Sequence, residues 1–327
     1  WITLLFSFSL CFCMSCSDSE SDKKEEGKVE EEKPVTVLSK TVPLADPYIL
    51  VHDSLYYIYG TNVGTGFDVY YSKDLEYWER ASALSLSHAN SYGESMFWAP
   101  EVYYVEKDKK FYMFYSTEEH ICVATADSPL GPFKQDEHKP IREEKSIDTS
   151  VFFDEDGKAY LYFVRFNDGN VIWCAELKEN LKEIKEDVGS EMCIRDRPWE
   201  LVLPKVVEGP SVFKQNGVYY LIYSANGYTS QDYAVGFATS DSPFGPWKKY
   251  EGNPVLHKCD GLVGVGHGAP FVDMEGKMRY VFHAHKSESE IHPRNSFVVD
   301  MFVKDSIVSL GGNIVRPMVV DRLPSGK

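Results

Sequence analysis

One sequence unit recurs five times along the chain, and this repeat limits the possible folds more than any other feature. Each unit has a short polar start, an apolar strand, a turn and a second strand rich in Tyr and Phe. The units start about 50 to 60 residues apart, at Ala45, Ala99, Ile147, Glu208 and His267. Strand pairs repeated at this period are typical of a β-propeller, whose blades surround a central axis.

A second repeated signature indicates outer hairpins. Residues 124–133 (ATADSPLGPF) and 238–247 (ATSDSPFGPW) are near copies, and residues 71–78 are a looser third. Each follows a predicted strand and precedes a turn with Pro or Gly. We therefore predict an all-β, five-bladed β-propeller with four-stranded antiparallel blades over residues 40–327. The alternative, a β-sandwich, would show shorter and less regular strand spacing.

The residues before this domain resemble a processed leader and a tether. Residues 1–16 are almost wholly apolar or Ser and too short to span a bilayer, and they end in Met-Ser-Cys. We predict a truncated lipoprotein-type signal peptide with Cys16 as the lipidation site, with an ordinary secretory signal as the alternative. Residues 17–39 are charged and poor in apolar side chains, which predicts a disordered tether. We expect an extracytoplasmic bacterial protein, lipid-anchored in the periplasm or at the cell surface.

Residues 188–197 (VGSEMCIRDR) do not fit the repeat. They interrupt the connection between the third and fourth units and show neither strand periodicity nor turn residues. They resemble a sequence-assembly artefact more than an evolved segment, and resequencing the gene would test this. We assign them no function, including Cys193. If they distort the fourth unit, the chain misfolds.

Composition narrows the class of partner. The formal net charge of −16 argues against nucleic acid, because phosphate binding needs clustered Lys and Arg. The aromatic share of 14 % suits a β-rich protein and a sugar-binding cleft, because aromatic rings pack on pleated sheets and on the apolar faces of sugars. We expect a monomer that binds a glycan.

Titratable residues occur at the starts of all five units. They are Asp46, Glu101, Asp148, Glu208 and His267. The first strand of each propeller blade lines the axis, so these side chains should converge at one mouth. Any one alone could equally be a turn or cap residue, but clustered buried carboxyls repel and lose hydration, which favours a functional role. Glycoside hydrolysis uses two carboxyls of unlike protonation, and a third negative charge raises the pKa of the acid.

Short motifs at these starts together resemble glycoside hydrolase family 43. The likeness covers residues 40–325 approximately, and the motifs occur in the family's order and spacing. The resemblance implies a five-bladed propeller of inverting enzymes that act mainly on arabinofuranosides and β-xylosides. The motifs are Ala45-Asp46-Pro47, Trp98-Ala99-Pro100-Glu101, Ile147-Asp148, Glu208-Gly209-Pro210 and Gly266-His267-Gly268.

The resemblance also implies a role for individual residues. Asp46 would be the general base that activates water and Glu208 the general acid, while Asp148 would raise the pKa of Glu208 and orient it. His267 matches an axial histidine that in many members lies beside a calcium ion or its waters. Calcium held through water is therefore the one cofactor implied. Arg294 resembles the arginine that hydrogen-bonds the sugar.

Three neighbouring residues are further candidates for substrate binding. Phe97 and Trp98 would stack on a sugar or, alternatively, belong to the core, and Glu101 would bind the substrate. Inversion implies carboxyls of Asp46 and Glu208 about 6.5–9.5 Å apart, with room for a water, whereas about 5 Å would indicate retention. The related invertase and fructanase family shares the propeller, but its Asn-Asp-Pro-Asn-Gly, Arg-Asp-Pro and Glu-Cys motifs are missing here.

The leading functional interpretation is an exo-acting α-L-arabinofuranosidase or β-xylosidase for plant cell-wall glycan. An endo-arabinanase is an alternative, because the difference depends on whether loops close one end of the cleft. A non-catalytic glycan-binding lipoprotein is a second class of function, since a fold alone does not establish catalysis.

Overall fold

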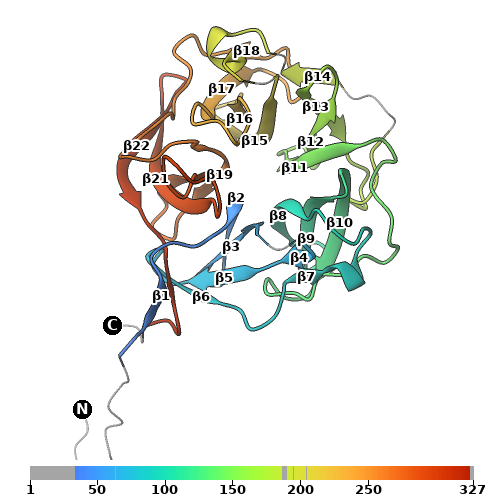
Figure 1. Cartoon of the computed structure of the whole chain (residues 1–327). Helices are drawn as coiled ribbons and strands as arrows, with labels where there is room; N and C mark the ends of the chain where they lie inside the picture. Colours follow the sequence, from blue (N-terminus) through green and yellow to red (C-terminus); the bar gives the residue numbers. More distant parts are fainter. Residues whose placement is uncertain (1–33, 63, 186–189, 194, 204, 325–327) are drawn as a thin grey trace, which may run out of the picture. The chain divides into compact units, whose positions relative to one another are not determined.

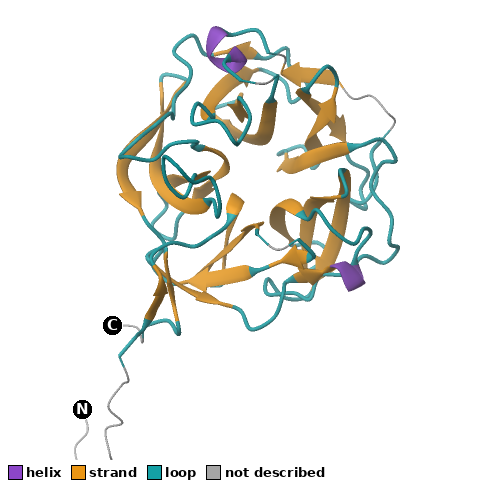
Figure 2. Cartoon of the chain, viewed as in Figure 1, coloured by secondary structure: helices purple, strands orange, loops and turns teal. Residues whose placement is uncertain are grey.

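The computed structural model describes residues 34–324 of the chain, apart from 63, 186–189, 194 and 204. The described residues form five β-sheets arranged as the blades of a propeller (Figure 1; Figure 2). The predicted all-β, five-bladed fold is confirmed. Helix in the described part amounts to two short 3-10 turns, η1 (His88–Asn90) and η2 (Pro198–Leu201). Within the same residues, no helix has the length and apolar character needed to span a membrane.

The first strand of every predicted unit is the innermost strand of a blade. Each inner strand contacts the inner strand of the next blade, and the fifth contacts the first, so the ring is closed. The inner strands are β2 (Ala45–His52), β8 (Trp98–Val105), β11 (Ser146–Phe153), β15 (Val207–Gln215) and β19 (Gly266–Val272).

The remaining strands follow outward from the axis in chain order. Blade one continues with β3 (Leu55–Thr61), β5 (Val69–Ser72) and β6 (Tyr77–Arg80), and blade two with β9 (Lys110–Thr117) and β10 (His120–Ala126). Blade three adds β12 (Ala159–Phe166), β13 (Asn170–Glu176) and β14 (Ser190–Cys193). Blade four adds β16 (Val218–Ala225), β17 (Ala234–Ser240) and β18 (Lys248–Lys249). Blade five adds β20 (Met278–Ala284), β21 (Asn295–Lys304) and β22 (Ile307–Val315).

Two blades differ from the predicted four strands. Blade two has three in the described residues, and a single bridge between Thr125 and Lys134 stands where an outer strand would lie. Blade one has six, because β1 (Val37–Ser39) and β23 (Met318–Val320), from opposite ends of the domain, add to its outer edge. A separate two-stranded sheet joins β4 (Gly66–Phe67) and β7 (Leu86–Ser87).

The folded part therefore begins slightly before the predicted boundary at residue 40. β1 pairs with β23, which runs parallel to β6, so the two ends of the domain are held in one sheet. The predicted signal peptide with Cys16, and residues 17–33 of the predicted tether, lie outside the described residues.

The core lies between adjacent blades, because each sheet packs both of its faces. Second strands supply its largest members, as the Tyr- and Phe-rich pattern predicts. Tyr59 and Tyr115 are fully buried between blades one and two, and Tyr162 and Tyr223 between blades three and four. This interblade packing leaves the starts of the inner strands free to carry polar groups at the axis.

Every inner strand has a β-bulge at the same place near its start. The register shifts between Ala45 and Tyr48 in β2, and the four other inner strands shift at the matching positions. One residue in each bulge takes a positive φ, namely Asp46 (50°), Ala99 (45°), Asp148 (56°), Gly209 (58°) and His267 (39°). The bulge re-aims the side chains of Asp46, Asp148 and His267 toward the axis.

The bulges correct the equivalence that the sequence repeat predicted. Asp46, Asp148 and His267 do occupy one structural position. Glu208 lies one residue before that position and Glu101 two residues after it. Pro47, Pro100 and Pro210 each follow the positive-φ residue directly, so an alignment of the motifs by their prolines gives the same equivalence as the register of hydrogen bonds.

At four seams, the backbone N–H of the bulge residue donates a hydrogen bond to a side chain of the preceding blade. The N–H of Ala99 donates to Thr61 Oγ1 (2.9 Å), that of Asp148 to Ser116 Oγ (3.0 Å), that of His267 to Ser224 Oγ (2.8 Å) and that of Asp46 to His283 Nδ1 (3.0 Å). All four acceptors occupy the same register position on the second strand of their blade. A buried N–H is thereby paired at each of these seams.

The seam between blades three and four is different. Its register position is Val164, whose side chain has no acceptor. The N–H of Gly209 donates instead to Oδ2 of Asp148 (3.3 Å), a bulge residue of blade three. Asp148 thus connects its own blade to the residue that follows Glu208.

The described part of residues 188–197 is packed into the propeller. β14 pairs with β13 as the outer strand of blade three. The N–H groups of Asp196 and Arg197 donate to Oε2 of the buried Glu200 (3.0 and 3.1 Å), and Lys249 Nζ donates to Asp196 Oδ1 (2.8 Å). These contacts give the described residues a structural place, and blade four keeps four strands. They assign no function to Cys193.

The seam hydrogen bonds predict a stability effect. Ser116→Ala removes the acceptor for a buried N–H, and we expect the free energy of unfolding to fall by about 1–3 kcal/mol. Urea or thermal denaturation of the variant measures this. Ser309→Ala, at an exposed serine of β22, is the control and should leave the midpoint unchanged. Equal midpoints for wild type and Ser116→Ala would show that the seam bond contributes nothing.

Candidate active site

A pocket of about 440 Å³ opens at the axis. Asp46, Asp148, Glu208 and His267 line it from four different inner strands, and Arg294 reaches it from the segment before β21. The three carboxyl residues are only 6–8 % exposed. The structure therefore brings together the side chains predicted to converge, although they stand far apart in the chain.

Asp46 is surrounded by cations and ring nitrogens. Arg294 donates to both of its carboxylate oxygens, from Nη1 to Oδ1 (2.8 Å) and from Nη2 to Oδ2 (3.4 Å). The Nδ1 atoms of His267 and His283 each lie 3.3 Å from Oδ1. Burial by itself would raise the pKa of Asp46, but the charge of Arg294 and the two histidines hold this pKa below its ordinary value. Asp46 is therefore ionised throughout the neutral range.

Glu208 has a different environment. The Tyr233 hydroxyl donates to Oε1 (2.9 Å) and Asn170 Nδ2 donates to Oε2 (2.8 Å). Burial raises the pKa of Glu208 to about 7, even though these two hydrogen bonds act to lower it. Near neutral pH this carboxyl can therefore keep a proton that an exposed glutamate would lose.

Asp148 is coupled to Glu208. Oxygen atoms of these two carboxyls and a ring nitrogen of His267 lie within 4.8 Å of one another. Burial, and then the neighbouring charges of Glu208 and Asp46, hold the pKa of Asp148 well above its ordinary value. Because two close carboxylates repel, Asp148 and Glu208 titrate as a pair that retains a proton. One pocket thus contains an ionised carboxylate and a protonated pair, the combination that acid–base chemistry requires.

Aromatic side chains form part of the rim. Trp98 is half-buried, while Phe166 and Tyr228 are 43 % and 39 % exposed, and all three line the pocket. Phe97 is only 1 % exposed and packs on Phe67 and Tyr115 in the core. Of the two predicted stacking candidates, Trp98 is therefore the one with an accessible ring.

Glu101 does not line this pocket. It lines a much smaller cavity of about 10 Å³, which it shares with Asp46, Asp148 and His267. Burial raises the pKa of Glu101 to about 8, against hydrogen bonds with Tyr103 and Ser150. At its position two residues beyond the bulge residue, the carboxyl accepts a hydrogen bond from Tyr103 and lies outside the lining of the larger pocket.

The small cavity is also where a calcium ion would be expected from the position of His267. Its space suits a single water, and the buried Thr149 Oγ1 at its wall has no hydrogen-bond partner among the described residues. Calcium prefers six to eight oxygen ligands. The carboxylates and this hydroxyl supply some of them, while His267 offers nitrogen. Because Asp46, Asp148 and His267 line both this cavity and the larger pocket, the residues fit a cation whose waters, including the one to His267, extend toward that pocket, and its presence stays a prediction.

Comparison with known proteins decides the family. The sequence matches the model described as glycosyl hydrolases family 43 over residues 37–300. The chain belongs to this family. It is accordingly a glycosidase, and the match spans nearly the whole propeller.

Solved and curated relatives agree with this assignment. An endo-1,4-beta-xylanase from Bacteroides thetaiotaomicron VPI-5482 is 52 % identical with a TM-score of 0.84, covering 87 % of this chain and 99 % of that one. An endo-arabinase from the same strain is 25 % identical with a TM-score of 0.69, covering 84 % and 99 %. A beta-xylosidase from Xylanibacter ruminicola is 33 % identical over 210 residues, which are 55 % of this chain and 62 % of that protein.

Sequence reasoning missed several residues of this family 43 site. His283 and Tyr233 are fully buried, so their residue types resemble ordinary core positions. Asn170 begins a strand and Tyr228 lies in a loop, so neither residue occupies one of the repeated positions that the sequence analysis used. A usable signal was His283 itself, because a histidine near the end of an apolar strand calls for a polar partner.

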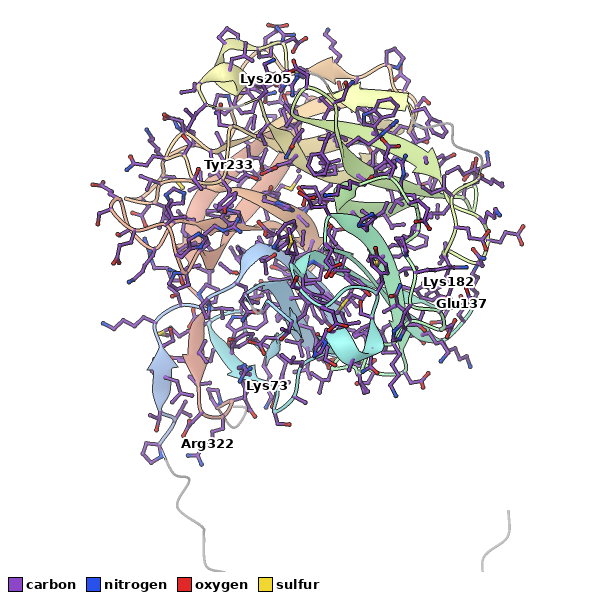
Figure 3. The ribbon with its side chains drawn as sticks, turned by 45° about the vertical axis from the view of Figure 1, so that its right-hand side comes forward. Lys73, Glu137, Lys182, Lys205, Tyr233 and Arg322 are labelled. Atoms are coloured by element: carbon purple, nitrogen blue, oxygen red, sulfur yellow. The ribbon has the colours of Figure 1, made fainter. Side chains whose placement is uncertain are left out.

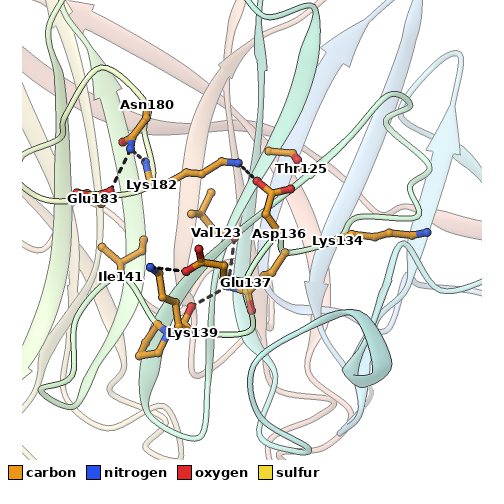
Figure 4. Close-up of a pocket in the computed structure, with 12 residues that line it drawn as sticks. Val123, Thr125, Lys134, Asp136, Glu137, Lys139, Ile141, Asn180, Lys182 and Glu183 are labelled. Atoms are coloured by element: carbon orange, nitrogen blue, oxygen red, sulfur yellow. Dashed lines mark hydrogen bonds and ion pairs between the residues drawn. The ribbon is translucent and has the colours of Figure 1, made fainter.

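A second hollow, of about 150 Å³, lies among residues 123–141 and 180–183 (Figure 4). Its three acidic groups are already paired, Asp136 with Lys182, Glu137 with Lys139 and Glu183 with Lys178. It has no aromatic side chain and shares no residue with the axial pocket. This hollow therefore lacks both the stacking surface and the free carboxyls of the candidate active site.

The pairing of Arg294 with Asp46 predicts a pH-dependent loss of stability. Both side chains are 9 % exposed, so Arg294→Gln leaves a buried carboxylate without its cation and should cost about 3 kcal/mol at pH 7. Because the pKa of Asp46 is lowered in the folded protein, the native pair stabilises above the unfolded pKa and loses its effect as the pH falls. The cost should shrink toward acid pH.

Urea denaturation of both proteins at neutral and acid pH measures this difference. Arg316→Gln is the matched control, because Arg316 pairs with Asp260 on the exposed surface. A cost for Arg294→Gln that is small, or equal at both pH values, would contradict the assigned ionisation of Asp46.

Proposed function

We propose that this family 43 enzyme hydrolyses arabinofuranosyl or xylosyl linkages of plant cell-wall polysaccharides or oligosaccharides with inversion. The observation that carries the proposal is the unlike protonation of the carboxyls in one pocket. Asp46 is held ionised by Arg294, while Glu208 and Asp148 retain a proton near neutral pH. A general base and a general acid are thereby available at the same pH.

In the proposed reaction, Glu208, Asp46 and Asp148 each have a separate role. Glu208 gives its proton to the glycosidic oxygen as the bond to the anomeric carbon breaks. Asp46 takes a proton from the water that attacks that carbon from the opposite face. Glu208 then stands ionised beside Asp148, and the repulsion between the two favours return of a proton to the pair. Asp148 also holds the N–H of Gly209, next to Glu208, which supports its role as orienting residue.

The proposed substrate class rests on the aromatic side chains at the rim of the pocket and on the names of similar proteins. Trp98, Phe166 and Tyr228 offer aromatic surface to the apolar faces of a sugar. Proteins named xylanase, arabinase and xylosidase are similar to this chain, which supports pentose-containing glycans as substrates.

One observation favours an endo-acting enzyme as the second candidate. A further hollow of about 400 Å³ adjoins the pocket and shares Trp98, Tyr228 and Arg294 with it. Its other lining residues include Thr61 and His292. Sugar units on either side of these shared residues would have space, as an internal site of a polysaccharide requires.

We expect Asp46→Asn and Glu208→Gln each to lower kcat by at least about 10²- to 10⁴-fold, because each removes a proton-transfer group. In the wild type, kcat/KM should fall as the pH rises through about 7, where Glu208 loses its proton. Release of 4-nitrophenol from the α-L-arabinofuranoside and the β-D-xyloside measures exo-action, and linear arabinan and xylan measure endo-action.

Glu290→Gln, at an exposed glutamate paired with Lys286, is the control and should retain full activity. Proton NMR of the first-formed anomer tests inversion, and a retained anomer would overturn that part of the proposal. Glycan binding without hydrolysis of any of the four substrates, unchanged in Asp46→Ala, would instead establish the binding-module alternative.

We further propose that a hydrated calcium ion occupies the small axial cavity. Such an ion would offset the charge of the carboxylates around it, while the chain's own residues carry out the proton transfers. Dialysis against EDTA should therefore lower Tm, and added CaCl2 should restore it. An unchanged Tm, with no calcium found by elemental analysis, would exclude the ion.

A further inference from the structure

Tyr233 contacts Glu208, the proposed acid, and also His283, a neighbour of Asp46, the proposed base. It lies directly before β17 in blade four, where it is labelled in Figure 3, and its side chain is fully buried. Its hydroxyl donates to Oε1 of Glu208 at 2.9 Å. With Asn170 on the other oxygen, this bond fixes the rotation of the Glu208 carboxyl.

The ring of Tyr233 supports the other side of the site. It stacks on the imidazole of His283, with ring centroids 5.6 Å apart and planes inclined by 14°. His283 is fully buried in β20, and its Nδ1 lies 3.0 Å from the backbone nitrogen of Asp46 and 3.3 Å from Oδ1. Its Nε2 lies 3.2 Å from Nη1 of Arg294. The Tyr233 ring thus packs against the imidazole of His283, and this imidazole contacts both Asp46, the proposed base, and Arg294.

Gly266 provides the space for this ring. A Cβ atom at position 266 would overlap Cε1 and Cδ1 of Tyr233. Gly266 is also the register partner of His283 in blade five. Tyr233 therefore fits between blades four and five only because residue 266 has no side chain.

We propose that Tyr233 is a positioning residue that holds the acid and the base of this enzyme at fixed positions relative to each other. This inference rests on the roles proposed above for Glu208 and Asp46. Its physical reason is that proton transfer requires both carboxyls within a few tenths of an ångström of their productive places, so a rigid link between them contributes to kcat. Substrate binding should change little, because Tyr233 does not line the pocket.

Tyr233→Phe tests the hydroxyl while keeping the stacked ring. We expect kcat to fall by about tenfold or more and KM to stay nearly constant, since the variant loses the hydrogen bond that fixes the rotation of the Glu208 carboxyl. The lost bond favoured the ionised form of Glu208, so the alkaline limb of the pH profile should move to higher pH. The other groups that face Glu208 stay unchanged in this variant. They are Asp46, Asp148, His267, Arg294 and Asn170.

Tyr162→Phe is the matched control, because that fully buried tyrosine donates to the backbone oxygen of Pro243 at 2.7 Å and lines no part of the pocket. It should leave kcat and the pH profile unchanged. Gly266→Ala is a second, independent variant that displaces the ring with every catalytic group intact, and it should reproduce the fall in kcat. Tm values confirm that each variant is folded at the assay temperature.

The outcomes separate this inference from the proposed function. A Tyr233→Phe enzyme with the kcat and alkaline limb of the wild type, beside an inactive Glu208→Gln enzyme, would overturn the positioning role alone. Full activity of Glu208→Gln would overturn the proposed acid, and the inference with it. A shift of the alkaline limb in Tyr162→Phe as large as in Tyr233→Phe would show a general stability effect and would also reject the role.

Discussion

The propeller and its active site depend on one interaction, the hydrogen bond from the bulge N–H of an inner strand to the preceding blade. Each bulge forces a positive φ and exposes an N–H that the sheet cannot pair. A hydroxyl meets this need at three seams and His283 at a fourth. Since these bonds join neighbouring blades, they fix the axial side chains relative to one another as well as holding the ring.

The two seams that depart from a hydroxyl acceptor are the ones that surround the proposed catalytic carboxyls. At blades five and one, the larger His283 reaches Asp46 and Arg294 and receives the ring of Tyr233. At blades three and four, Val164 offers no acceptor, and Asp148 takes the N–H beside Glu208. The structural repeat thus varies at the seams beside the proposed acid and base, and the same bonds that close the ring also orient these two side chains.

Burial produces the opposed protonation states from similar side chains. All three carboxyls lose hydration to a similar extent, which favours the neutral form. Arg294 reverses this for Asp46, because its charge lies within 2.8 Å of the carboxylate. Glu208 and Asp148 have no such cation at that distance among the described residues, and their mutual repulsion adds to the effect of burial. The placement of Arg294, with His267 and His283 beside it, therefore decides which carboxyl is ionised and so which one is proposed as the base.

The sequence by itself determined the number of blades, the strand at the axis and the residues Asp46, Asp148 and Glu208, because a repeat of fixed period places its polar starts at one mouth. Tertiary structure decided the rest. The true register shifts Glu101 into the small axial cavity, and packing on Phe67 and Tyr115 buries Phe97. Tyr233 and Asn170 became visible as partners of Glu208 only once the strands of blades three and four were in place, and His283 as a partner of Asp46 only once blade five met blade one. The physical reason is that a repeat encodes strand order and the residues at its starts, whereas protonation and positioning depend on side chains outside the repeat positions that approach in the folded ring.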